Sequence, residues 1–452
     1  MFKKIELWIV VLLCIFVVIF TILYGALLRH HYIGGQRFQT LQKVTVFFAE
    51  IPNNIKNINF RKTKGGKIII ENKSDTPSVL SRHKDKPRFK RYISSDREVL
   101  LVLPRYDGNL LRSVVEIIDL NTFEVLHTYK HDINSMNNLI DPTKKENERV
   151  KIDHAEIRFA YQHPLITKNF EMISIGSDVI FKTDFCSNLI WINQEERFHH
   201  SIMLDSNENI WVGSQMFPYS DLISNYINDY GFRDDAIAKI NQKGQILFIK
   251  SVIEILIENK IKGENILQIY DSIHLNDIEP TFNDTEYWKK GDLFISMRHQ
   301  PAIIHYRPTT NKIINYIKGP FYQQHDVDVI SDKEISIFNN NPPVENSKYS
   351  EVLIYNFETK TFSKKFNKQL QQNDFKTISD GLADILNDGS MLVEEQNYGR
   401  LIFFNKDGEK EWEFVNKDDK GNIYVLSWSR IIEDKNLISK LKEKIKNTTC
   451  LN

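Results

Sequence analysis

The amino-acid sequence predicts an all-β fold, a six-bladed β-propeller, preceded by one N-terminal transmembrane helix. Three observations lead to this fold class. The first 30 residues contain a long apolar run without charge, the chain holds 28 Phe and 18 Tyr, and a strand-and-turn pattern recurs six times. Aromatic side chains favour pleated, half-buried surfaces, and repeats of ~40–50 residues are typical of four-stranded propeller blades.

The apolar run extends from Leu7 to Leu28 and is long enough for a helix that crosses the hydrocarbon core of a membrane. Lys3 and Lys4 precede it, and Arg29 follows it. The run is longer than the apolar part of a cleaved signal peptide and has no convincing cleavage site. We therefore expect residues 1–30 to form an uncleaved signal anchor. Charge alone does not fix its orientation, because both flanks are basic.

The charge distribution indicates a basic connector over residues 31–90, in which we also expect short strands. The whole chain of 452 residues has 59 Lys and Arg against 59 Asp and Glu, so its formal net charge is zero. A chain that binds nucleic acid should be basic overall, so no nucleic-acid partner is expected.

The three cysteines, Cys14, Cys186 and Cys450, are too few for a disulfide framework and too scattered for a metal knuckle.

Six short apolar segments mark the blades of the propeller that we expect over residues 91–434. Five of them end in Asn, and residues suited to tight turns, such as Gly244, Asn311 and Gly408, follow several of them. The segments are 117–121, 189–193, 237–241, 303–307, 352–356 and 401–405. Their ends are separated by 72, 48, 66, 49 and 49 residues. A second hairpin precedes most of them, so each unit would supply four strands.

The C-terminal part of the chain should close the ring. The segment 423–428 follows the last full unit and is expected to complete the first blade, because radial closure leaves few exposed sheet edges. The charged tail, residues 435–452, is expected to contain a short helix over residues 436–446.

Histidine recurs where the first strand of a blade is expected to begin. His154, His200, His274 and His325 each precede a strand-like segment. The first strands of a propeller line its central channel and begin at the same face, so these side chains should meet at one channel mouth. Arg298 ends the second strand of the His274 blade and should reach the same mouth. A lone histidine is usually structural, but four at equivalent positions beside an arginine indicate a site.

An arginine among histidines suits an oxyanion better than a metal ion. Histidine clusters also bind zinc, but Arg298 would repel a dication and no carboxylate clearly joins the set. The guanidinium offers a planar donor fork for sulfate or phosphate, and imidazole supplies donors or a nucleophile. We therefore expect neither a metal nor a cofactor.

Three segments around these residues resemble the bacterial arylsulfotransferase family. They are residues 271–280 (DSIHLNDIEP), 291–304 (GDLFISMRHQPAII) and 324–326 (QHD). The resemblance implies a propeller enzyme that moves a sulfuryl group from an aryl sulfate ester to a phenolic acceptor, without the nucleotide sulfate donor PAPS. It also implies a propeller on the periplasmic or extracellular side of the membrane.

The same resemblance implies roles for four residues. His325 would be the nucleophile that becomes sulfohistidine, and Arg298 and His274 would bind the sulfuryl oxygens and stabilise the developing charge. His200 would add a donor or shuttle the phenol proton. Such a covalent relay at a single site predicts ping-pong kinetics.

Three further residues are expected to help bind substrate. His199 and His154 would lie at the channel mouth, and Trp428 would stack on phenol rings. The pair His199–His200 resembles the family, but Ser201 stands where an Asp often follows. The choice between the two histidines therefore stays open.

Two other functions fit a propeller. The first is a non-catalytic, membrane-anchored module that binds a ligand or another protein, since propellers host many unrelated functions. The second is a quinone-cofactor dehydrogenase, which would repeat a tryptophan motif in each blade. The six tryptophans do not recur at one repeat position, so this function ranks last. The identity of donor and acceptor and the oligomeric state do not follow from the sequence.

Overall fold

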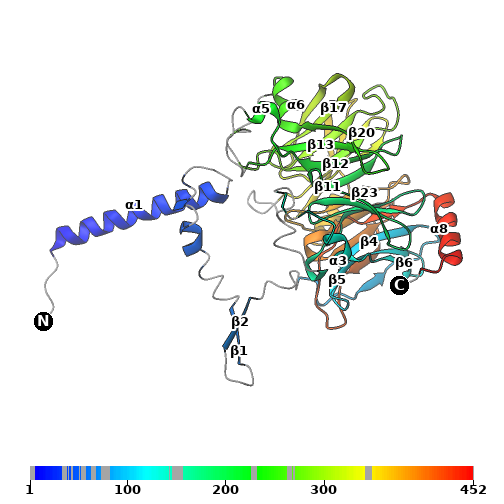
Figure 1. The fold of residues 1–452 in the computed structure, drawn as a ribbon, viewed down its shortest axis with the longest axis horizontal. Coiled ribbons are helices and arrows are strands. Elements are labelled where there is room, and N and C mark those ends of the chain that lie inside the picture. Colours follow the sequence, from blue (N-terminus) through cyan, green and yellow to red (C-terminus); the bar gives the residue numbers. More distant parts are fainter. Residues whose placement is uncertain are drawn as a thin grey trace. The chain divides into compact units, whose positions relative to one another are not determined.

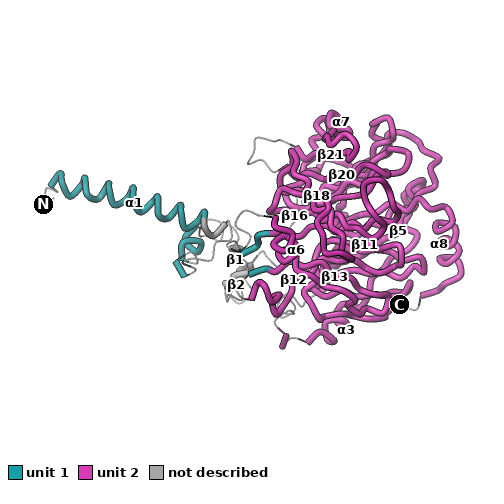
Figure 2. The backbone as a smooth tube through the Cα atoms, turned by 90° about the horizontal axis from the view of Figure 1, so that it is seen from above, with its two compact units in different colours: residues 1–75, 226–233, 265–272 teal, residues 76–225, 234–264, 273–452 magenta. Residues whose placement is uncertain are grey.

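The computed structural model describes residues 6–32, 38, 40–41, 44–49, 51, 58–62, 68–72, 82–141, 143–144, 156–224, 232–261, 267, 270–341 and 349–450. The chain divides into two compact units (Figure 2). The smaller unit comprises residues 1–75, 226–233 and 265–272, and the larger unit comprises residues 76–225, 234–264 and 273–452.

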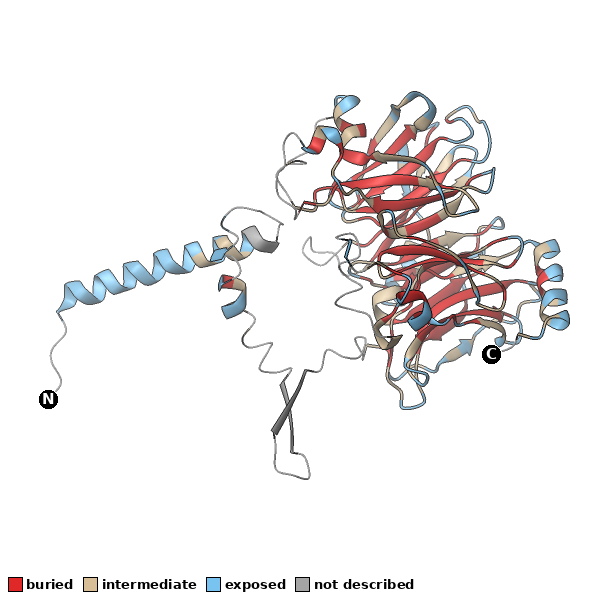
Figure 3. Ribbon diagram, in the orientation of Figure 1, coloured by how far each residue is buried: buried red, intermediate tan, exposed pale blue. Residues whose placement is uncertain are grey.

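The smaller unit contains the apolar helix α1 (Leu7–Tyr32). Its 23 residues Leu7–Arg29 are long and apolar enough to cross a membrane, which confirms the predicted helix. The side chains in this stretch are exposed along most of its length (Figure 3). An antiparallel hairpin of β1 (Ile58–Lys62) and β2 (Ile68–Asn72) follows in the chain, where short strands were expected.

The larger unit is a six-bladed β-propeller, which confirms the predicted fold class (Figure 1). Every blade is an antiparallel sheet of four strands, and the last blade has a fifth strand at one edge. In pairing order, the blades are β27 (Arg430–Ile432), β4 (Leu100–Asp107), β5 (Arg112–Asp119) and β6 (Glu124–Tyr129); β7 (Gln162–Ile166), β8 (Met172–Gly176), β9 (Val179–Thr183) and β10 (Leu189–Asn193); β11 (Arg197–Leu204), β12 (Ile210–Gln215), β13 (Asp235–Ile240) and β14 (Ile246–Ser251); β15 (Leu275–Pro280), β16 (Leu293–Met297), β17 (Ala302–Arg307) and β18 (Lys312–Lys318); β19 (Val327–Ser331), β20 (Glu334–Asn339), β21 (Glu351–Asn356) and β22 (Thr361–Lys364); and β23 (Leu382–Ile385), β24 (Met391–Glu395), β25 (Arg400–Phe404), β26 (Lys410–Val415) and β3 (Phe89–Arg91).

Short helices connect some of these strands. They are α3 (Ile133–Asn137), η2 (Glu156–Arg158), α5 (Asp221–Ser224), α6 (Val252–Glu258), η3 (Pro308–Thr310), α7 (Asn367–Gln372) and η5 (Gln396–Tyr398), and α8 (Lys435–Asn447) follows the last strand.

The apolar core lies between neighbouring blades (Figure 3). Leu100 and Val115 of the first blade pack with Met172 and Phe181 of the second. Similar clusters join the second blade to the third, the fourth to the fifth, the fifth to the sixth and the sixth to the first. Because successive side chains of a strand point to opposite faces, each blade can pack against two neighbours. This face-to-face packing brings the first strands of the blades together.

The ring closes through β27, the C-terminal strand, which pairs with β4 and places Arg430 opposite Val102. The prediction that segment 423–428 supplies the closing strand was wrong by a few residues. That segment contributes two isolated bridges, Leu426 with Arg105 and Ile423 with Lys417. At the other end of the propeller chain, β3 adds an edge strand to β26, so residues from the expected connector belong to the last blade.

The second blade differs most from the prediction. Five of the six marker segments are third strands, but Leu189–Asn193 is the fourth strand, and the third is β9. The segment that follows His154 begins with the short helix η2 rather than with a first strand. The first strand of this blade is β7 and carries His163. His154 itself lies outside the described residues.

The expected tail helix is present as α8, and a disulfide follows it. Ile438 and Leu441 of α8 are buried in the cluster between the first two blades. Cys186, after β9, forms a disulfide with Cys450, 264 positions later in the sequence. Sequence reasoning missed this pair, because nothing local connects two cysteines so far apart. The disulfide therefore ties the C-terminal tail to the second blade.

Candidate functional site

Four histidines from four consecutive blades form one cluster. The ring centroid of His200 lies 5.3 Å from that of His274 and 5.6 Å from that of His325. His163 lies 6.0 Å from His200 and 6.5 Å from His325. The structure thus brings together three predicted residues and adds His163, which sequence reasoning missed.

A repeated backbone feature orients three of these histidines. His163, His200 and His274 have φ angles of 48°, 56° and 50°, and the strand register shifts at or beside each of them. A residue with a side chain in this left-handed region costs about 1–2 kcal/mol, and bulges often re-aim side chains beside active sites. The same strained backbone conformation occurs in three blades. The rest of the fold therefore compensates for this strain, and the strain sets the direction in which these imidazoles point.

Arg298 lies directly after β16 and beside the cluster. Its backbone N–H donates to the carbonyl of His274 at 3.0 Å, and its Nη2 donates to Gln323 Oε1 at 3.1 Å. Its positive charge also lowers the pKa of His325. The arginine is therefore positioned by residues of two neighbouring blades.

His325 is held at the entrance to β19 with 1% of its surface exposed. Its backbone N–H donates to the carbonyl of Phe338 at 2.9 Å. The preceding Gln324 donates from Nε2 to the carbonyl of Met297 at 2.7 Å. These bonds connect His325 to its own blade and to the strand end that precedes Arg298, so the two residues are fixed relative to each other.

Burial favours the neutral form of three of these histidines, His163, His200 and His325. It lowers the pKa of His325 to about 4, and Arg298 acts in the same direction while Asp380 opposes it. Burial also lowers the pKa of His163 and of His200 well below 6.5, and the neighbouring histidines add to this effect. A neutral imidazole retains a lone pair, so the cluster holds nucleophilic nitrogen at neutral pH.

His199 and Trp428 occupy different surroundings. His199 Nε2 faces Asp235, 3.4 Å from its Oδ1, whereas the next residue, His200, belongs to the cluster. The Trp428 ring stacks on His163 at 4.0 Å and lies 5.5 Å from the ring of His325. Trp428 is therefore an aromatic wall of the cluster, and His199 is a neighbour that faces away toward a carboxylate.

A sequence model of the family described as Arylsulfotransferase (ASST) matches residues 163–417, more than half of the chain. The chain belongs to the arylsulfotransferase family. The match begins at His163 and includes His200, His274, Arg298 and His325, so the resemblance seen in the sequence is confirmed. No curated protein sequence matches the chain.

Several solved structures are similar to this arylsulfotransferase-family chain at low sequence identity. A protein of unknown function from Bacteroides caccae is 12% identical, with a TM-score of 0.46 over 75% of this chain and 100% of that one. TolB from Acinetobacter baumannii is 11% identical, with a TM-score of 0.44 over 75% and 68%. Virginiamycin B lyase from Staphylococcus aureus is 11% identical, with a TM-score of 0.34 over 56% and 69%.

A buried cluster of charged residues lies on and beside the first strands of the arylsulfotransferase propeller. Arg430 of β27 donates to the carbonyl of Ile202 at 2.8 Å. Four carboxylates from the fourth, fifth and sixth blades act on its charge: Asp277, Asp326, Asp328 and Asp384. Burial raises the pKa of Asp277 and of Asp384 to about 6. The hydrogen bonds of Arg430 to the carbonyls of Pro164 and Ile202 connect the first blade to the second and the third.

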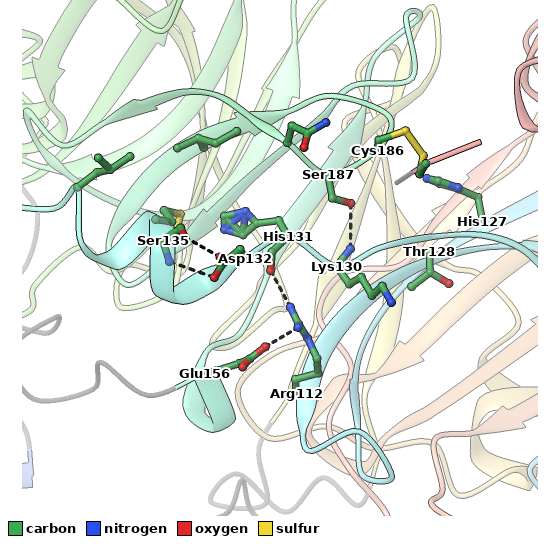
Figure 4. Close-up of a pocket in the computed structure, with 15 residues that line it drawn as sticks. Arg112, His127, Thr128, Lys130, His131, Asp132, Ser135, Glu156, Cys186 and Ser187 are labelled. Atoms are coloured by element: carbon green, nitrogen blue, oxygen red, sulfur yellow. Dashed lines mark hydrogen bonds and ion pairs between the residues drawn. A yellow bond between two sulfur atoms is a disulfide. The ribbon is translucent and has the colours of Figure 1, made fainter. Parts of the chain in front are cut away.

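A separate cavity of about 630 Å³ lies between the first two blades, beside the disulfide (Figure 4). Arg112 lines it, forms an ion pair with Glu156 and donates to the carbonyl of His131 at 2.7 Å. Asp132 accepts from Ser135 in the same wall. None of the clustered histidines lines this cavity. It is therefore distinct from the candidate catalytic cluster of the arylsulfotransferase propeller.

Proposed function

We propose that this protein transfers a sulfuryl group from an aryl sulfate ester to a phenolic acceptor through a sulfohistidine at His325. Family membership supports a sulfotransferase in general. The observation that carries the finer proposal is the convergence of a buried, neutral His325 with Arg298 and the other histidines. A nucleophile and an oxyanion-binding arginine within one cluster are what sulfuryl transfer requires.

The first half-reaction forms the covalent intermediate. The Nε2 lone pair of His325 attacks the sulfur of the donor, the N–S bond forms, and the bond from sulfur to the phenolic oxygen breaks. The phenolate leaves with the electron pair. Arg298 and His274 bind the sulfuryl oxygens and stabilise the charge that shifts during transfer.

The second half-reaction returns His325 to its starting state. A phenol attacks the sulfur of the sulfohistidine, and the bond between sulfur and nitrogen breaks. His200 donates to the sulfuryl group, and the phenol passes its proton to a base in the site. His163 and Trp428 form the wall against which a phenol ring packs, because aromatic rings gain by offset stacking.

The compartment proposed for the propeller is the periplasmic or extracellular side, with α1 as the membrane anchor. The disulfide between Cys186 and Cys450 supports this orientation, because disulfides persist in oxidising compartments and are rare in the cytosol. Aryl sulfates and phenols from outside the cell would then reach the channel mouth directly.

Steady-state kinetics with varied donor and acceptor test the function. We expect parallel double-reciprocal lines, the signature of a ping-pong relay, and loss of turnover in His325→Ala. A folded wild type that turns over no aryl sulfate would contradict the proposal and favour a non-catalytic binding module.

A further inference from the structure

Asp380 places one carboxylate oxygen beside the side chain of His325. Its Oδ1 lies 3.8 Å from His325 Nε2. Its other oxygen, Oδ2, accepts hydrogen bonds from Ser379 Oγ and Asn397 Nδ2, both at 2.8 Å. The protein therefore fixes one oxygen and directs the other at the nucleophile. The side chain is 32% exposed, so a substrate can reach it.

The turn that carries Asp380 is built to hold this position. Asn397, which binds the carboxylate, also accepts from the backbone N–H of Ile378 at 2.9 Å through its Oδ1. Gly381 has a φ of 130°, and a Cβ there would lie 2.8 Å from the carbonyl oxygen of Glu394. Only glycine fits such a position without strain. The location of the Asp380 carboxylate is therefore specified by the fold.

We propose that Asp380 is the general base that removes the proton from the phenolic acceptor. This role rests on the sulfuryl transfer proposed above. As the phenol oxygen attacks the sulfohistidine, the O–S bond forms and the S–Nε2 bond breaks, and its electron pair returns to Nε2. The phenolic proton moves to Oδ1 of Asp380. It is later released to solvent or to the phenolate that leaves the next donor.

Charge favours Asp380 over the histidines as the proton acceptor. A proton on His200 or His163 would add positive charge inside a buried cluster. Burial and the neighbouring histidines already lower the pKa values of both residues. A proton on Asp380 instead removes a negative charge beside the anionic sulfuryl group. Glu394, a second carboxylate near Asp380, is fully buried and accepts from the backbone N–H of Trp428 at 2.9 Å. Its position suits a structural role.

The two half-reactions, measured separately in Asp380→Asn, test this assignment. The amide oxygen of Asn can still accept from Ser379 and Asn397, so the turn should keep its shape. Phenol release from 4-nitrophenyl sulfate without acceptor should stay close to the wild-type rate. Transfer to weakly acidic phenols should fall about 10²–10⁴-fold, the usual contribution of a positioned base. Phenols already ionised at the assay pH should lose little.

Matched controls make the result decisive. Asp407→Asn changes an exposed carboxylate in a hairpin of the same blade, and it should leave both half-reactions unchanged. If Asp380→Asn does not fold, Asp380→Ser allows the same comparison. An equal loss of rate in both half-reactions would overturn the role of Asp380 as a base. A loss of transfer rate that does not depend on the acidity of the acceptor phenol would overturn it as well. No phenol release from the folded wild type would overturn sulfuryl transfer itself, and the role of Asp380 with it.

Discussion

Arg298 contributes geometry as well as charge to the histidine cluster. Its planar guanidinium can offer two parallel hydrogen bonds to a sulfuryl group, whereas the ammonium of lysine is a point charge. We therefore expect Arg298→Lys to slow phenol release from the donor by ~10²–10³, the typical effect of removing one oxyanion donor. Single-turnover measurements with 4-nitrophenyl sulfate would show this loss.

A matched control for Arg298 lies in the same blade. Arg307 is committed to an ion pair with Asp292 at 2.7 Å, so Arg307→Lys should leave the rate of phenol release near that of the wild type. A rate for Arg298→Lys equal to that of the control would contradict a bidentate role for Arg298.

The lowered pKa of His325 predicts an unusual acid limit for the first half-reaction. Attack requires the neutral imidazole, and burial holds its pKa at about 4. The rate should therefore stay level as the pH falls through 6.5 and should decline only near pH 4. The pH profile of kcat/KM for the donor reports this value for the free enzyme. An inflection near 6.5 would show that His325 behaves as a solvated histidine.

Acid also acts on the fold, so this profile needs a stability control. The pKa values of His163 and His200 are lowered on folding, so below about 6.5 the unfolded chain binds more protons than the folded one. Their contribution to stability is present above that pH and is lost as the pH falls. Activity recovered after return to neutral pH would separate protonation of His325 from unfolding.

Most residues of the candidate cluster could be predicted from the sequence. The contacts that residues of different blades make with one another could not. His274, Arg298 and His325 were found because strand ends and the family resemblance mark them. His163 was missed because β7 was assigned to the wrong segment. Asp380 was missed because its position next to His325 depends on how the fifth and sixth blades pack, and no local pattern records that packing.

At the scale of elements, the alternation of short apolar strands and tight turns was sufficient to predict six blades. The second blade was assigned wrongly because the marker, an apolar strand that ends in Asn, also describes its fourth strand, Leu189–Asn193. The closing strand has only three residues, Arg430–Ile432. Such a short segment has too little periodicity to be distinguished from the neighbouring segment 423–428.

The disulfide at the end of α8 should stabilise the closed ring. It connects Cys186 and Cys450 across 264 positions, and cross-links that restrict the unfolded chain typically contribute about 2–5 kcal/mol. We expect Cys450→Ser to lower the urea midpoint of unfolding. A reductant should lower the wild-type midpoint to the same value and should not affect Cys450→Ser. Identical midpoints for oxidised wild type and variant would contradict a stabilising role.

At the scale of the whole molecule, the proposed orientation places the propeller outside the cytoplasm with α1 in the membrane. Protease added to intact spheroplasts should then digest the propeller and leave a cytoplasmic control protein intact. The charge on both flanks of α1 does not decide the direction, so this experiment is needed. A propeller that stays protected while a periplasmic control is cut would show the reverse orientation.

The central claim is that His325 carries the sulfuryl group between donor and acceptor. Rapid quenching after mixing with an aryl sulfate, followed by intact-mass analysis and peptide mapping, tests it most directly. The account predicts one added sulfuryl group per chain, located on His325, which disappears when a phenol is added and never forms in His325→Ala. A sulfuryl group on another residue, or a normal burst of phenol with label in His325→Ala, would contradict it.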